Sequence, residues 1–185
     1  IDHVINLKMK MDQRWDMCTE GNLQCSLALW KDVKNSSQLK DRILSQDIRD
    51  VCFINPTFLL EPFCAVVAAN KAAIAQQRKS MITKSILTEI LFNLSPSSNI
   101  RDALQTFGIN DESTHLLGLI FLDKNSEATR FDALGVQGTR IPLDNLSKFS
   151  DESAIRKKYK VSNTVTDRSS LVKYVTSKIA SKSLL

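Results

Sequence analysis

Basic residues and short polar residues surround one loop of this sequence, and residues of these types bind phosphate. The loop is "SPSSN", residues 95–99, which separates an apolar run from an amphipathic segment. The basic residues near it in the sequence are Lys71, Arg78, Lys79, Lys84 and Arg101. A helix that begins after the loop presents unpaired N–H groups and a partial positive charge to an anion. The pattern predicts contact with a phosphodiester backbone or a single-stranded nucleic-acid end, although an ordinary capped helix explains the same residues.

Residues that could catalyse a reaction or bind a metal lack the spacing that such sites need. His3 and His115 have no neighbouring serine, cysteine or carboxylate in a pattern typical of a catalytic triad. The four cysteines, Cys18, Cys25, Cys52 and Cys64, contain no CxxC pair, and two histidines do not complete a familiar zinc ligand set. Glycine-rich nucleotide-binding loops are absent as well. We therefore expect no enzymatic activity, no cofactor and no metal.

The cysteines and the charges indicate where the protein works and what it meets. Cys25, Cys52 and Cys64 lie among apolar residues, as buried thiols of a reducing compartment do, so we expect a protein of the cytoplasm or nucleus. The net charge is +5, and the whole excess lies after residue 149, where eight basic residues face three acidic ones. Such a segment suits a phosphate or an acidic partner, or forms a solvated helix face. The sequence contains no apolar run long enough for a membrane helix, so we expect no membrane contact.

The segments before the loop have recognisable secondary-structure patterns. Residues 22–33 predict a buried strand, and Ser36 or Ser37 caps a helix after it. The apolar face of that helix is expected to comprise Leu39, Ile43 and Leu44. Residues 51–62 contain two prolines, and the residue before each proline favours an extended backbone, which predicts a buried connector.

A long helix is predicted from Pro62 to Gln77, because the missing N–H of Pro62 has no partner in a first helical turn anyway. Its apolar stripe comprises Phe63, Val66, Val67, Asn70 and Ile74. The opposite side carries Ala65, Ala68, Ala69, Ala72, Ala73 and Ala75. Alanines there let another backbone come close. Asn70 within the stripe is either a hydrogen-bonded core residue or part of a site.

The segment that leads into the loop, residues 83–95, fits a helix and a strand equally well by periodicity. The abrupt break at the loop makes a strand at 86–94 the more economical prediction. Ser98 or Asn99 then caps a helix that Gly108 ends, and its stripe comprises Ile100, Ala103, Leu104 and Phe107. Residues 113–123 predict a second central strand, apolar on both faces.

The last part of the chain is predicted to be partly irregular and then helical. Residues 124–150 contain two glycines and predict irregular structure with a short helix at 144–149. "DESAIRKKYKVS" has acids first and bases last, as the helix dipole prefers. A final helix from Ser169 or Ser170 to Ser181 has one apolar side, comprising Leu171, Val172, Val175 and Ile179.

Four motifs in the same order along the chain make a resemblance visible. They are "LWKDVKN" (29–35), "INPTFLLEPFCAVVAANKA" (54–72), "TEILFNLSPSSNIRDALQTFGI" (88–109) and "IRKKYKVS" (155–162). Together they resemble the kinase-binding subunit of the KEOPS complex, also called EKC. The resemblance runs from about residue 25 to the last helix and leaves residues 1–20 and 123–140 without a clear match.

The resemblance implies a fold and a function. The fold is a single α+β domain over 1–185, with a central, mostly antiparallel β-sheet packed by α-helices, an edge segment at 1–20 and a C-terminal helix at 169–185. It also implies a strand at 86–94. KEOPS complexes make threonylcarbamoyl-adenosine next to the anticodon of tRNAs that read ANN codons, and a different, metal-containing subunit performs the transfer. Members of this family are non-catalytic: they bind and support the small atypical kinase/ATPase subunit and help to recruit tRNA through its 3′ CCA end. Some eukaryotic members are also linked to telomere maintenance and transcription.

Combined with the residue patterns, the resemblance implies two surfaces. The tRNA surface is expected to comprise Lys71, Arg78, Lys79, Lys84, Asn93, Ser95, Ser97, Ser98, Asn99 and Arg101. The kinase surface is expected to use exposed apolar residues, namely Phe58, Leu59, Leu171, Tyr174 and Val175. The alternative is a free-standing RNA-binding domain without a kinase partner.

Overall fold

The fold is built on an antiparallel sheet. Within residues 12–124 and 130–182, which the computed structural model describes, five strands pair in the order β1-β2-β4-β3, and β5 pairs with β2. Their bounds are β1 Asp12–Asp16, β2 Leu23–Lys31, β3 Val51–Ile54, β4 Leu116–Asp123 and β5 Thr139–Ile141. Every pairing is antiparallel, which confirms the predicted α+β class. The strands predicted at 22–33 and 113–123 are confirmed as β2 and β4. Part of the expected edge segment 1–20 lies outside the described residues, and its described part contains the edge strand β1.

Alternating side chains of the strands fill two cores, one on each face of the sheet. In β2, Leu27 and Leu29 belong to one core, whereas Ala28 and Trp30 belong to the other. This double burial is why the sequences of β3 and β4 are almost continuously apolar, since neither face of these strands meets water. Gly118 of β4 leaves room for an indole, because a Cβ there would lie 2.7 Å from the ring of Trp30.

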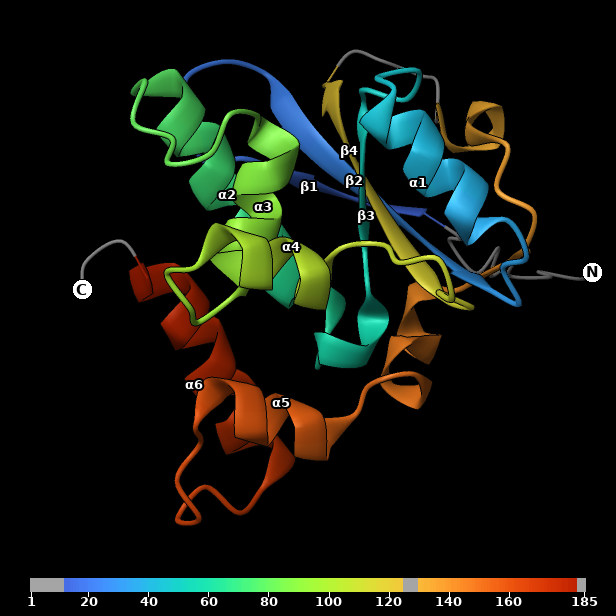
Figure 1. The fold of residues 1–185 in the computed structure, drawn as a ribbon. Helices are drawn as coiled ribbons and strands as arrows, with labels where there is room; N and C mark the ends of the chain where they lie inside the picture. The colour runs from blue at the N-terminus through green and yellow to red at the C-terminus, as the bar shows by residue number, and fades with distance from the viewer. Residues whose placement is uncertain (1–11, 125–129, 183–185) are drawn as a thin grey trace, which may run out of the picture.

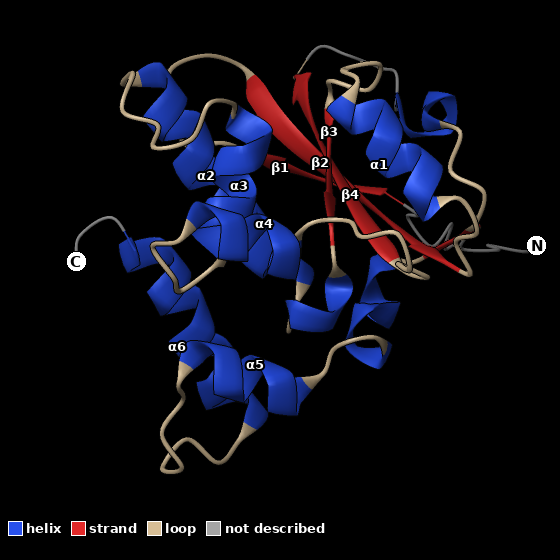
Figure 2. Ribbon diagram, viewed as in Figure 1, coloured by secondary structure: helices blue, strands red, loops and turns tan. Residues whose placement is uncertain are grey.

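Helices cover both faces of the sheet, as Figures 1 and 2 show. They are α1 Ser36–Leu44, α2 Pro62–Gln77, α3 Ile86–Leu94, α4 Ile100–Phe107, α5 Glu152–Tyr159 and α6 Arg168–Ser181, with 3-10 turns at Pro56–Phe58, Arg130–Leu134 and Leu143–Lys148. Helix α1 packs on one face with the turn at 130–134, and residues of the other α-helices form the larger core on the opposite face. No helix in the described ranges is both long and apolar enough to cross a bilayer.

The prediction of a strand at 86–94 is wrong, because these residues form helix α3. A reciprocal capping box starts the helix: the Ser85 Oγ accepts from the Thr88 N–H at 3.2 Å, and the Thr88 Oγ1 accepts from the Ser85 N–H at 3.3 Å. The strand beside β4 comes instead from the proline-containing segment, where β3 forms part of the expected connector. Periodicity did not reveal the cap, which is the local signal for a helix at this position.

The bounds of α2 agree with the prediction, but its buried face is not the predicted apolar stripe. The alanine side is the buried one, with Ala68, Ala69 and Ala72 fully covered, and Phe63 of the predicted stripe is 51% exposed. Small side chains let α3 and α6 pack closely against α2. In α1, Leu39 is buried as predicted, but Leu44 is 71% exposed at the end of the helix.

Candidate functional site

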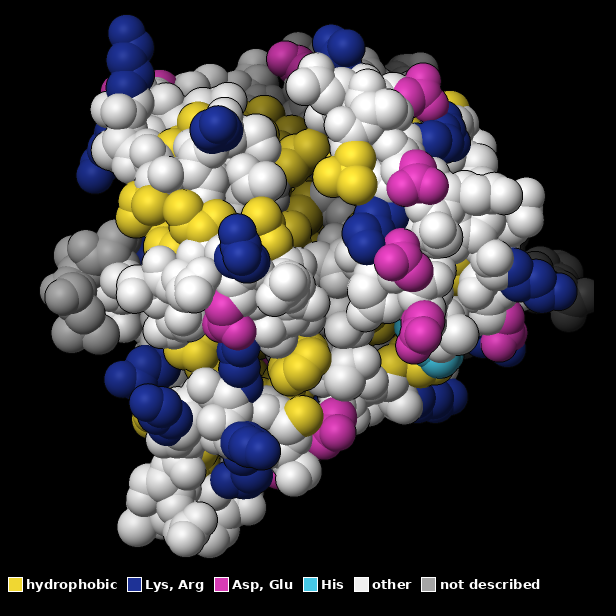
Figure 3. Space-filling view, in the orientation of Figure 1, with side chains coloured by type: hydrophobic (Ala, Val, Ile, Leu, Met, Phe, Trp, Pro, Cys, Tyr) yellow, Lys and Arg dark blue, Asp and Glu magenta, His cyan; other side chains and the backbone are white. Residues whose placement is uncertain are grey.

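Four of the five cations expected to contact phosphate near the loop are exposed. Arg78 and Lys79 lie where α2 ends, Lys84 precedes α3, and Arg101 lies in the first turn of α4. Lys79 adopts a left-handed φ of 55°, which turns the chain out of α2. On the face shown in Figure 3, Lys and Arg side chains predominate on the left, and most of the Asp and Glu side chains lie on the right, around α1.

The loop at 95–99 is ordered by its own side chains. The Ser95 Oγ accepts from the Ser97 N–H at 3.1 Å, and the Ser97 Oγ accepts from the Asn99 N–H at 3.1 Å. The Asn99 Oδ1 accepts from the Asp102 N–H at 3.2 Å and so caps α4, as predicted. Ser95 is buried, whereas Ser98 and Asn99 are exposed. The side chains of Ser95 and Ser97 therefore order the turn, and the exposed residues of the loop are Pro96, Ser98 and Asn99.

Two residues of the predicted tRNA surface join helices inside the protein. Asn93 is 5% exposed and donates its side-chain amide to the Ala68 carbonyl at 3.3 Å. Lys71 is half-buried and donates to the Ala180 carbonyl at 2.7 Å, and burial lowers its pKa. These contacts connect α2 with α3 and with α6. The structure therefore places Asn93 in the interior and Lys71 at a helix junction.

Helix α3 separates the remaining residues into two groups. Arg78, Lys79 and Lys84 lie beside the start of α3, whereas Ser98, Asn99 and Arg101 follow its end (Figure 1). A helix of 9 residues is about 13 Å long at 1.5 Å per residue, so one phosphate cannot touch both groups. A nucleic-acid strand that lies along α3 can place different phosphates against the two groups.

Lys182, absent from the predicted surface, fixes the 95–99 loop from the other end of the chain. Its ammonium group donates to the carbonyls of Phe92 and of Ser97, the latter at 2.8 Å, and lies 3.4 Å from the centre of the Phe92 ring. Burial lowers the pKa of Lys182 to about 8. In the sequence this lysine is one of several in a basic tail, and nothing there connects it with the loop.

Glu89 is a second residue that orders this region and that the sequence patterns did not identify. The side chain is 3% exposed and accepts hydrogen bonds from the loop that carries Lys84. Its donors are the Ile82 N–H at 3.1 and 3.2 Å, the Thr83 N–H at 2.7 Å and the Thr83 hydroxyl at 2.7 Å. A buried carboxylate thus orders the segment between α2 and α3.

The kinase surface is predicted to consist of exposed apolar residues, and the predicted exposure is wrong for three of the five. Leu59, Leu171 and Val175 are each 1% exposed or less and belong to the larger core. Phe58 and Tyr174 are partly buried and pack against the same core. Removing the chain after residue 163 would expose this core, so such a truncation cannot test docking on an intact fold.

The histidine and cysteine side chains considered for catalysis or metal binding pack against other residues of the fold. The ring of His115 packs on Phe149, with centroids 4.1 Å apart, and its Nδ1 lies 2.9 Å from the Thr114 hydroxyl. Cys25, Cys52 and Cys64 are buried as predicted, and burial raises the pKa of Cys25 to about 12, which keeps the thiol protonated. Among the described residues, no three His, Cys, Asp or Glu side chains are grouped so that they could hold a metal ion.

Comparison with known proteins shows the family. The family model "Kinase binding protein CGI-121" matches residues 30–183. The chain is 34% identical over 135 residues to "EKC/KEOPS complex subunit TPRKB" of Danio rerio, which covers 72% of this chain and 76% of that protein. It is 32% identical over 146 residues to "EKC/KEOPS complex subunit CGI121" of Yarrowia lipolytica, covering 77% and 83%. The chain therefore belongs to the CGI-121 family of kinase binding proteins.

Proposed function

We propose that this chain is a non-catalytic subunit of a KEOPS (EKC) complex, in which it binds the small atypical kinase/ATPase subunit and helps to recruit tRNA. The observation that carries the proposal is the family match over 30–183, together with relatives named as subunits of this complex. The complex would form threonylcarbamoyl-adenosine next to the anticodon of ANN-decoding tRNAs, in the cytoplasm and nucleus. Another subunit would perform the transfer.

Co-purification from cells tests the kinase partnership. A tagged copy of the chain is expected to retain a small kinase-like protein and, through it, the other subunits of the complex. Recovery of RNA without any kinase-like protein would favour the alternative, a free-standing RNA-binding domain. Multiple turnovers by the isolated chain would contradict a non-catalytic role.

The tRNA contact is proposed for the exposed residues beside both ends of α3. Lys79, Lys84 and Arg101 are exposed, so each can approach a phosphate. Contacts of this kind release counterions, and the slope of log affinity against log salt falls by roughly 0.9 for each phosphate neutralised. Reversing all three charges is expected to weaken tRNA binding and to flatten that slope by about 2–3.

A matched control removes the effect of net charge alone. It reverses three exposed cations elsewhere on the chain, namely Lys34, Arg49 and Lys148. Affinity for tRNA is measured at two salt concentrations for the wild type and both variants. Equal weakening by the two variants would show that the total charge, and not the surface beside α3, attracts tRNA.

A further inference from the structure

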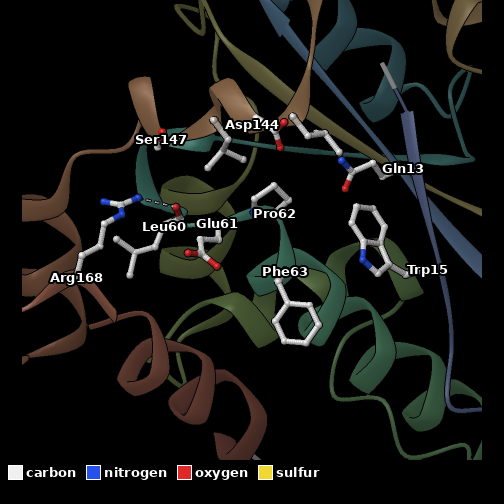
Figure 4. A pocket seen from close by; sticks show the side chains of 11 residues that line it. Gln13, Trp15, Leu60, Glu61, Pro62, Phe63, Asp144, Ser147 and Arg168 are labelled. Atoms are coloured by element: carbon white, nitrogen blue, oxygen red, sulfur yellow. Dashed lines mark hydrogen bonds between the residues drawn. The ribbon is translucent and has the colours of Figure 1, made fainter. Parts of the chain in front are cut away.

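A cavity of about 440 Å³ opens at the N-terminal end of α2, at the opposite end of this helix from Arg78 and Lys79. Its walls come from β1, from the start of α2, from the 3-10 turn at 143–148 and from the start of α6 (Figure 4). A volume of this size lies in the range of ligand pockets, which is about 300–1,000 Å³. All the residues that line it are among those that the structure describes.

One side of the cavity is aromatic. Phe63 is the second residue of α2 and is 51% exposed, which is high for a phenylalanine. Trp15 of β1 is half-buried, and both rings line the cavity on the same side in Figure 4. Exposed rings in a concave site offer apolar contact and an electron-rich face to a cation.

The carboxylates of the cavity are available for a ligand. Glu61 and Asp144 are exposed, and within residues 12–124 and 130–182 neither carboxylate has a hydrogen bond or ion pair. Glu61 precedes α2, but its side chain does not cap that helix. The one basic lining residue, Arg168, donates to the Leu60 carbonyl at 3.0 Å and lies 3.5 Å from the Glu152 carboxylate. Glu152 also pairs with Arg156 at 3.0 Å, so the two arginines share this carboxylate. The lining itself contains two carboxylates and one guanidinium group, so the site is negative on a protein of net charge +5.

We propose that this cavity receives an arginine or lysine side chain of the kinase-type subunit, an inference that rests on the function proposed above. The aliphatic stem of such a side chain would pack on Phe63 and Trp15, and its charged end would pair with Glu61 and Asp144. The same carboxylates repel phosphate, so the cavity does not suit an RNA backbone.

The position of the cavity allows both partners to bind together. Helix α2 has 16 residues and is therefore about 24 Å long, with the cavity at its start and Arg78 and Lys79 at its end. A stable protein contact needs about 800 Å² on each partner, so the cavity anchors part of a wider interface. Occupation of the start of α2 leaves its other end, with Arg78 and Lys79, open to tRNA.

The test measures the affinity of the purified kinase subunit for variants of the full chain. Glu61→Gln with Asp144→Asn removes the two carboxylate charges, and Phe63→Ser removes one aromatic ring. The control, Asp41→Asn with Glu112→Gln, removes two exposed charges from other surfaces. We expect the cavity variants to bind the kinase about tenfold more weakly or worse, and the control to bind within about twofold of the wild type. Melting temperatures of all variants verify that they are folded.

The possible failures are distinguishable. If the wild-type chain does not bind the kinase, the proposed function is wrong and this inference falls with it. If the wild type binds but the cavity variants bind equally well, only the cavity assignment is overturned. A loss of tRNA binding with unchanged kinase binding would also overturn it, because the cavity would then serve the nucleic acid.

Discussion

Glu89→Ala is expected to destabilise the protein and to loosen the loop before α3 without changing any exposed cation. The carboxylate accepts from two backbone N–H groups and one hydroxyl, with Ile82 N–H shared between both oxygens. Hydrogen bonds to a charged group contribute about 1.5–3 kcal/mol each, and water can replace part of that at the exposed Ile82. We therefore expect the free energy of unfolding to fall by about 3 kcal/mol, which lowers Tm by roughly 6–12 °C in a chain of this size.

Glu89→Gln keeps the shape of the side chain and removes its charge, so it measures the contribution of the charge to stability. The amide oxygen can take the position that receives three of the hydrogen bonds, so the bonds remain but lose their ionic character. We expect a loss of about 1–2 kcal/mol, between those of the wild type and the alanine variant. Glu112→Ala, at an exposed position, is the control and should change stability by less than about 0.5 kcal/mol.

Urea unfolding and amide hydrogen exchange measure these effects. In the wild type the Ile82 and Thr83 amides should exchange slowly, and in Glu89→Ala they should exchange at rates close to those of an open loop. Weaker tRNA binding by this variant would follow, because the same loop carries Lys84. Unchanged exchange at both amides, with less than about 0.5 kcal/mol lost, would refute the assigned role of Glu89.

Two further predictions concern helix packing and pH. Leu171→Ala should lower the free energy of unfolding by about 3 kcal/mol, because it leaves a cavity in the core. The control, Lys173→Ala on the exposed side of α6, should lower it by less than about 0.5 kcal/mol. Equal values for the two variants in urea unfolding would contradict the packing of α6. The hydrogen bond from Lys158 lowers the pKa of the folded Asp102 carboxyl below the 3.8 of an unperturbed carboxyl. The pair therefore stabilises the fold at a pH above 3.8, and this contribution disappears as the pH falls through the pKa of the folded state. The stability difference between wild type and Asp102→Asn should therefore shrink from about pH 7 to about pH 3, and a constant difference would argue against this pair.

The elements that the sequence predicts well are helices whose first and last residues carry local start and stop signals. The bounds of α2 agree with the prediction because Pro62 can begin a helix and residues 63–77 contain nothing that breaks one. Helix α4 agrees because Asn99 caps it and Gly108 ends it. These signals act within one turn, so they do not depend on the rest of the fold.

The features that the sequence does not predict depend on distant contacts. The apolar residues of 86–94 fit two periods, and a capping box with a partner helix decides between them. The sequence places Leu171 and Val175 on the apolar side of a helix, but only the fold shows that other residues of the same chain bury this side. The contact of Lys182 with the carbonyl of Ser97 spans 85 positions, and no local pattern announces it.

Helix α6 also governs when the protein can fold during its synthesis. Leu171, Val175 and Ile179 complete the core on α2, yet they leave the ribosome after every strand of the described sheet. Until they emerge, an apolar surface stays open to chaperones and proteases. A stop codon shortly after residue 163 would therefore reduce the cellular amount of the protein through quality control.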